Sequence, residues 1–159
     1  MKKISLLAVL MLLLSACTQK LNWPDLPLAE VTDVFPDATS VKTIDTAYYQ
    51  VKKGDAVMGV VLFSSPYSDA VMGYAGATPL RIVLDENNKI KEVKLLDNDE
   101  TPRFVQRVAY GGLFDAWNGM TVDQALQAPI DAVSGATYTS NGVMESLKVR
   151  LEAYQKQAK

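Results

Sequence analysis

The arrangement of apolar and polar residues predicts two β-hairpins. Each consists of two apolar-rich runs separated by a short polar turn, at Lys53-Gly54-Asp55 and at residues 85–88. The run at 57–64 is almost continuously apolar, which is typical of a strand buried on both faces. The paired runs are 46–52 with 57–64, and 80–84 with 90–96.

Helical periodicity is clearest at the C-terminal end. Within residues 140–157, apolar side chains recur three or four positions apart and form one stripe, made of Met144, Leu147, Leu151 and Tyr154. Residues 103–118 favour helical turns interrupted at Gly111-Gly112, and 65–78 and 129–139 favour loops.

These elements define the expected fold class, although residues 29–45 leave a short helix before Phe35 open. Hairpins followed by helices are typical of an α+β domain. We therefore expect a largely antiparallel sheet of hairpins packed with helices, including a C-terminal amphipathic helix.

The N-terminal residues resemble a bacterial lipoprotein signal. Lys2 and Lys3 precede an apolar segment, residues 4–14, that is shorter than the roughly 20 residues needed to span a bilayer. Leu14-Ser15-Ala16-Cys17 resembles the lipobox, in which the cysteine is lipidated and the preceding residues are removed. The alternative is that Cys17 lies near an ordinary signal-peptidase site by chance.

The lipobox resemblance implies a division of the chain. It predicts a signal peptide at 1–16, a lipidated Cys17 with a tether to residue 28, and a folded domain at 29–159. Two or more acyl chains give stable anchoring. The expected location is the extracytoplasmic face of a bacterial membrane, with inner and outer membrane left open.

Composition narrows the chemistry. The 159 residues include 16 Lys+Arg and 18 Asp+Glu, so the mildly acidic chain lacks the basic character of a nucleic-acid binder. There is no histidine, which excludes His-dependent triads and His-ligated metal sites, and one cysteine cannot form an intrachain disulfide. We predict no metal and no nucleic-acid partner. The groups that could still carry the chemistry are hydroxyls, carboxylates, backbone amides or an acquired cofactor.

The candidate chemistry is concentrated in residues 131–140, DAVSGATYTS. This loop carries four hydroxyls and runs into the C-terminal helix, for which Ser140 or Asn141 is a plausible N-cap. Free amides and the helix dipole at such a terminus favour a phosphate group. A hydroxyl-rich capping loop without a ligand is the alternative.

The same loop resembles the flavinylation motif of FMN-binding domains, Asp-x-x-Ser/Thr-Gly-Ala-Thr. This family includes the FMN-carrying small subunits of sodium-pumping NADH:quinone reductase and of the Rnf-type electron-transport complex. Residues 100–102, 73–76 and 85–93 also resemble family segments, with Asn88 in place of the usual turn glycine. Asn tolerates the positive φ of that turn.

The resemblance implies that Thr137 carries FMN through a phosphoester, attached by a separate flavin transferase that uses FAD and Mg²⁺. Asp131 would belong to the sequence that the transferase recognises. Tyr67, Tyr74 and Tyr138 are candidates to stack on the ring. The candidate cofactor-binding residues are Thr137, Ser134, Gly135, Ala136, Thr139, Ser140, Asp131, Glu100, Thr101, Pro102 and Tyr74.

The implied function is electron transfer with a membrane-bound redox partner. An electron carrier or a subunit of an oxidoreductase system is favoured over a complete enzyme. Two alternatives remain: a flavin-carrying component of a reductase that acts with a catalytic partner, and a binding or structural lipoprotein without flavin.

Thr139, two positions after Thr137, offers a second hydroxyl. It is predicted to lie nearer the helix cap, with its hydroxyl occupied by a backbone amide.

Overall fold

The structure, a computed structural model, describes residues 23–159. The predicted signal peptide, residues 1–16, and Cys17 therefore lie outside the described residues. Five antiparallel strands form one sheet in the order β1-β2-β3-β4-β5, each paired with the next along the chain. Their bounds are β1 Ser40–Asp45, β2 Tyr48–Lys53, β3 Ala56–Phe63, β4 Leu80–Asp85 and β5 Ile90–Leu95.

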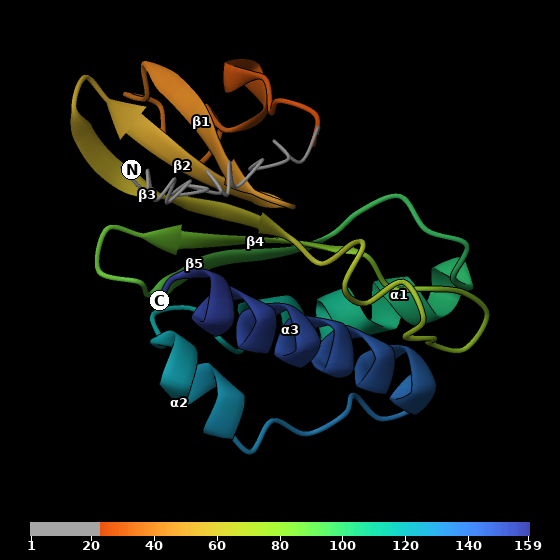
Figure 1. The fold of residues 1–159 in the computed structure, drawn as a ribbon. Coiled ribbons are helices and arrows are strands. Elements are labelled where there is room, and N and C mark those ends of the chain that lie inside the picture. The colour runs from red at the N-terminus through yellow and green to blue at the C-terminus, as the bar shows by residue number, and fades with distance from the viewer. Residues whose placement is uncertain (1–22) are drawn as a thin grey trace, which may run out of the picture.

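The α+β prediction is confirmed, because helices follow the sheet and pack on one of its faces (Figure 1). The helices are η1 Leu28–Glu30, α1 Pro102–Tyr110, η2 Leu113–Asp115, α2 Val122–Gln127 and α3 Thr137–Gln157. Both predicted hairpins are present, and Asn88 adopts φ +57° at the β4–β5 turn as expected. The interruption between α1 and η2 falls at Gly111-Gly112, where Gly112 has φ +75°.

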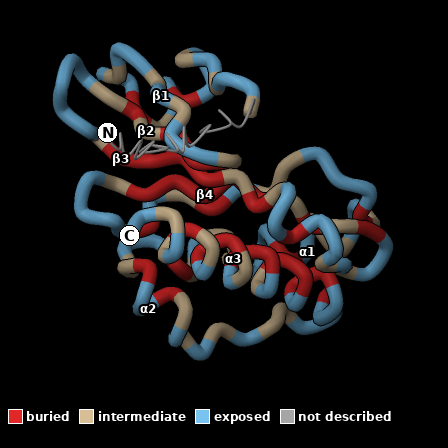
Figure 2. The backbone as a smooth tube through the Cα atoms, viewed as in Figure 1, coloured by how far each residue is buried: buried red, intermediate tan, exposed pale blue. Residues whose placement is uncertain are grey.

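The sheet has an apolar cluster on each face, and buried residues follow one another along its central strands (Figure 2). Leu62 and Ile82 face the helices, whereas their neighbours Val61 and Val83 face the opposite side. Because successive side chains of a strand point to opposite faces, a strand covered on both sides must be apolar throughout. This explains the continuous apolar run in β3.

The N-terminal segment covers the face opposite the helices. Val31 and Phe35 are buried there, and Arg81 of β4 holds the segment by donating from Nη1 to the Glu30 carbonyl at 2.8 Å and from Nη2 to Asp33 Oδ2 at 2.8 Å. Residues 23–28, the described part of the predicted tether, also lie against this face; Trp23, Leu26 and Leu28 pack on it. The polypeptide is thus tied to the sheet from Trp23 onward.

Helix α3 runs across the helical face and joins the functional motif to the core. Its predicted stripe is confirmed, since Leu147, Leu151 and Tyr154 are buried and Met144 is half-buried against the same core. Near its C-terminal end, the buried Arg150 donates from Nη2 to the Ala47 carbonyl at 2.9 Å, and burial lowers the Arg150 pKa to about 10. The first turn of α3 therefore belongs to an element fixed along its length.

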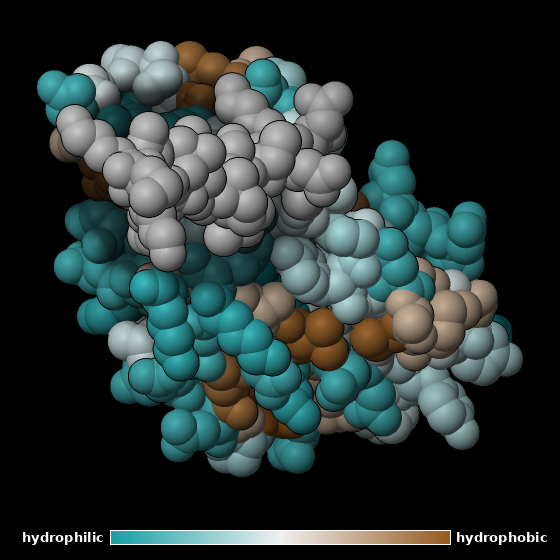
Figure 3. All heavy atoms as spheres, viewed as in Figure 1, coloured by the Kyte–Doolittle hydropathy of each residue, from teal (hydrophilic) through white to brown (hydrophobic). Residues whose placement is uncertain are grey.

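On the face of the molecule shown in Figure 3, the described residues are mostly hydrophilic, and hydrophobic residues gather over the helical half. Within residues 23–159, no helix combines the length and apolar character needed to cross a membrane.

Candidate functional site

The motif threonine occupies the first position of α3. Thr137 is exposed, and the N-cap is Ala136, which makes no side-chain capping bond. The predicted caps Ser140 and Asn141 are wrong, because both lie inside the helix. Ser140 instead donates to the Ala136 carbonyl at 2.9 Å and accepts from the Val133 amide at 3.1 Å, which closes the preceding loop onto the helix.

The two threonines of the motif have opposite environments. Thr139 is fully buried, and its hydroxyl donates to Glu100 Oε2 at 2.6 Å. The expectation that a backbone amide occupies this hydroxyl is therefore wrong; a carboxylate does. Of the two side chains, only Thr137 presents its hydroxyl to a reagent from solution.

Glu100 joins the start of α3 to the loop before β4. Its Oε1 accepts from the amides of Ala75 and Gly76 at 2.8 and 2.9 Å. Burial acts to raise the Glu100 pKa, but the hydrogen bonds from these backbone amides and from the Thr139 hydroxyl together hold that pKa below its usual value. The carboxylate is thus a buried anion with three donors, and it fixes the loop that carries Tyr74.

Close backbone packing accompanies this polar junction. A side chain at Gly142 of α3 would place its Cβ 2.9 Å from Gly73 Cα and 3.0 Å from Gly73 N, closer than real Cβ contacts. Glycine at position 142 therefore lets the 73–76 loop lie directly on α3.

A hollow of about 190 Å³ opens beside Thr137. Tyr74 packs edge-on against Phe104 with ring centroids 4.7 Å apart, and Tyr138 lies 6.4 Å from Tyr74. Tyr74 and Tyr138 are 56% and 69% exposed, so aromatic faces remain open to a ligand. The lining residues are Tyr74, Phe104, Gly135, Ala136, Thr137, Tyr138 and Thr139.

The remaining predicted residues occupy several positions around this hollow. Thr101 is the N-cap of α1 and Pro102 its first residue; neither lines the hollow, but both set the start of the helix that supplies Phe104. Asp131 and Ser134 are exposed in the preceding loop. Sequence reasoning missed Phe104, because this side chain reaches the hollow through the packing of α1 and no local pattern marks it.

Tyr67 is a wrong prediction for ring contact. Its ring lies 4.8 Å from the Arg150 guanidinium, and its hydroxyl accepts from Gln157 Nε2 at 2.9 Å, at the far end of α3. Arg150 follows Thr137 by 13 residues, about 20 Å along the helix axis, so Tyr67 lies well away from the hollow beside Thr137.

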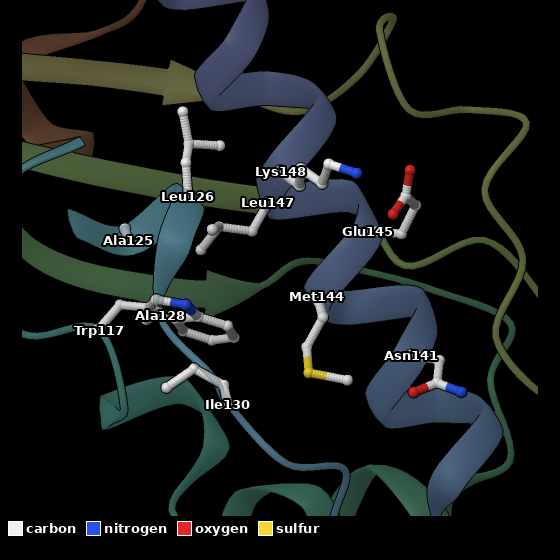
Figure 4. Close-up of a pocket in the computed structure, with 10 residues that line it drawn as sticks. All are labelled: Trp117, Ala125, Leu126, Ala128, Ile130, Asn141, Met144, Glu145, Leu147 and Lys148. Carbon is white, nitrogen blue, oxygen red and sulfur yellow. The ribbon is translucent and has the colours of Figure 1, made fainter. Parts of the chain in front are cut away.

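A second hollow, of about 330 Å³, lies farther along α3 (Figure 4). Its lining includes Met144 of α3, and Trp117 and Ile130 lie on the side of the hollow opposite the helix. Its lining includes no residue of the motif 131–137. The hollow beside Thr137 is therefore the one that the motif itself builds.

Comparison with known families agrees with this geometry. The family model described as FMN-binding domain matches residues 73–152, half of the chain, which includes the 73–76 loop, Glu100 and the motif. No curated protein matches the chain. The chain belongs to the FMN-binding domain family, and its cofactor class is FMN.

Proposed function

We propose that Thr137 carries FMN as a phosphoester and that the domain transfers electrons on the extracytoplasmic face of a bacterial membrane. The observation that carries this proposal is the exposed Thr137 hydroxyl at the rim of an aromatic hollow, in a member of an FMN-binding family. The hollow fits a flat flavin ring, because Tyr74, Phe104 and Tyr138 supply aromatic surfaces for stacking.

Attachment requires a second protein. The chain has no histidine, and Glu100 already accepts bonds from Thr139 and two amides, so Thr137 has no evident local base. In the proposed step, Thr137 Oγ1 bonds to the phosphorus of the FMN half of FAD while the bond to AMP breaks. AMP leaves with the bridging oxygen, and the hydroxyl proton is released. The exposed motif is accessible to such a transferase.

The small hollow favours a carrier. Pockets that enclose a whole drug-sized ligand measure about 300–1,000 Å³, whereas this one measures about 190 Å³. Part of the flavin would therefore remain outside, within reach of a redox partner. A bound flavin accepts and donates electrons, and the protein positions the ring and sets its environment. The described residues contribute stacking surfaces and a fixed attachment point.

Reduction experiments test the carrier assignment. Protein loaded by its transferase should show a flavin absorption spectrum, be reduced by dithionite and be reoxidised by a membrane redox partner. NADH alone should leave it oxidised, because the sequence contains no Gly-x-Gly-x-x-Gly segment of the kind that binds dinucleotides. Rapid reduction by NADH would instead favour a reductase component, and a folded protein with no flavin would favour the binding or structural lipoprotein.

Membrane anchoring gives a separate prediction. We propose that Cys17 is lipidated; from it to Trp23, the first described residue, the chain reaches at most about 20 Å. The flavin domain would then work close to the membrane surface. Cys17→Ser should move the protein from the membrane fraction to the soluble fraction without changing its unfolding midpoint. Persistence of the variant in carbonate-washed membranes would contradict the lipid anchor.

A further inference from the structure

The guanidinium of Arg107, on α1, lies directly against Gly135 of the motif. Gly135 has φ +77°, and a Cβ built on it would collide with Nη1 of Arg107 and stand 3.2 Å from Cζ of the same side chain. Glycine is required here both for the left-handed backbone and for the close approach of the guanidinium. The exposed side chain of Arg107 thus lies beside Gly135, two residues before Thr137.

The charge of Arg107 has no partner among the described residues. The ion pairs within residues 23–159 involve Lys53 and Arg81, and no side-chain hydrogen bond is made by Arg107 there. Arg103, one turn earlier on α1, lies over the Phe104 ring at 4.6 Å instead. Two cations of one helix thus differ: one covers an aromatic ring, and the other faces the attachment loop.

We propose that Arg107 binds the phosphate of FMN and thereby makes the site selective for the phosphorylated flavin. This inference rests on the proposed function, since it places the phosphate at Thr137. A phosphodiester retains one negative charge, and the planar guanidinium offers forked donors suited to phosphate oxygens. Arg107 is a positioning residue: by holding the phosphate it orients the ribityl chain toward the hollow lined by Tyr74 and Phe104.

The loaded protein provides the first test. In ³¹P NMR, Arg107→Gln should shift the phosphodiester resonance, and the anisotropy of flavin fluorescence should fall because the cofactor is held at fewer points. The matched control Arg103→Gln removes the same charge one turn away and should leave the resonance in place. An unchanged resonance in Arg107→Gln, or equal shifts in both variants, would overturn the proposal.

Unloaded protein provides the second test. The protein carries Thr137→Val, which prevents covalent attachment, and is titrated with FMN and with riboflavin, which lacks the phosphate. Arg107→Gln should weaken FMN binding about tenfold or more while leaving riboflavin binding unchanged, because only FMN has an anion to contact. Equal weakening of both ligands would overturn the phosphate contact in favour of a structural role.

Loading with flavin distinguishes a failure of the proposed function from a failure of the role of Arg107. If wild-type protein acquires no flavin at Thr137, the proposed function fails. If wild type is loaded and Arg107→Gln keeps the wild-type resonance and FMN affinity, only the role of Arg107 fails. Should Arg107→Gln resist loading, Arg107→Lys decides: recovery of loading supports the charge contact, and failure with an intact fold overturns it.

Discussion

Replacing Thr137 by valine should abolish covalent flavin completely when the protein is produced together with its transferase. Valine keeps the shape of threonine but has no oxygen with which to form the phosphoester. The variant should fold as wild type, because the hydroxyl at position 137 is exposed and makes no side-chain hydrogen bond in the described residues. Flavin fluorescence in a denaturing gel, normalised to protein, measures the loss.

Thr139→Val is the matched control, two residues away. This variant should keep its covalent flavin but lose about 1–3 kcal/mol of unfolding free energy, because it removes the hydroxyl that donates to the buried Glu100. Covalent fluorescence retained in Thr137→Val, or lost in a folded Thr139→Val, would contradict the assignment of the attachment residue.

Replacing Glu100 by alanine should produce the largest loss of stability, about 3 kcal/mol or more. The substitution leaves the amides of Ala75 and Gly76 and the Thr139 hydroxyl without their acceptor at a buried position. The 73–76 loop should then detach from α3 and carry Tyr74 away from the hollow. Urea denaturation measures the stability, and amide hydrogen exchange at Ala75 and Gly76 reports the loop.

Glu100→Gln is the conservative control for this junction. Its carbonyl oxygen can still accept from the two amides, and its amide group can donate to the Thr139 hydroxyl, so the loss should be smaller than in Glu100→Ala. An equal loss in both variants would show that the charge, and not the number of hydrogen bonds, stabilises the loop. Wild-type stability in Glu100→Ala would contradict the junction altogether.

The lowered pKa of Glu100 also fixes the sign of a pH effect. A carboxylate whose pKa is lower in the folded state stabilises the fold above the unfolded value, here 4.5. That contribution is lost as pH falls through the lower folded pKa. The difference in unfolding free energy between wild type and Glu100→Gln should therefore be constant near neutral pH and shrink in acid below about pH 4.5. A difference that grows in acid would contradict the direction of the pKa change.

The hairpins were predictable because their strands are apolar enough to show their burial in the sequence. Edge strand β1, Ser40–Asp45, was not recognised because its side chains are exposed or half-buried and carry little hydrophobic signal. The short helix α2 was also missed, although Thr121 and Gln124 form a capping box that marks its start. Helix α3 begins three residues earlier than predicted, since Ser140 bonds within its first turn and does not cap it.

The candidate site was predictable only where neighbouring residues in the chain form it. Residues 131–137 are contiguous, so their pattern identifies Thr137 directly. By contrast, Phe104 and Arg107 reach the motif through the packing of α1 against the loop before α3, which no local pattern encodes. Glu100 was predicted to be a cofactor-binding residue, yet its carboxylate already accepts hydrogen bonds from Ala75, Gly76 and Thr139.

The most direct test of the central claim is peptide mapping of protein purified from its native host. Trypsin releases the segment 108–148, which has no internal lysine or arginine and contains the whole motif. Tandem mass spectrometry should find this peptide heavier by the mass of FMN minus water, with the added mass on Thr137. An unmodified peptide, or a flavin located on Ser134 or Thr139, would contradict the account.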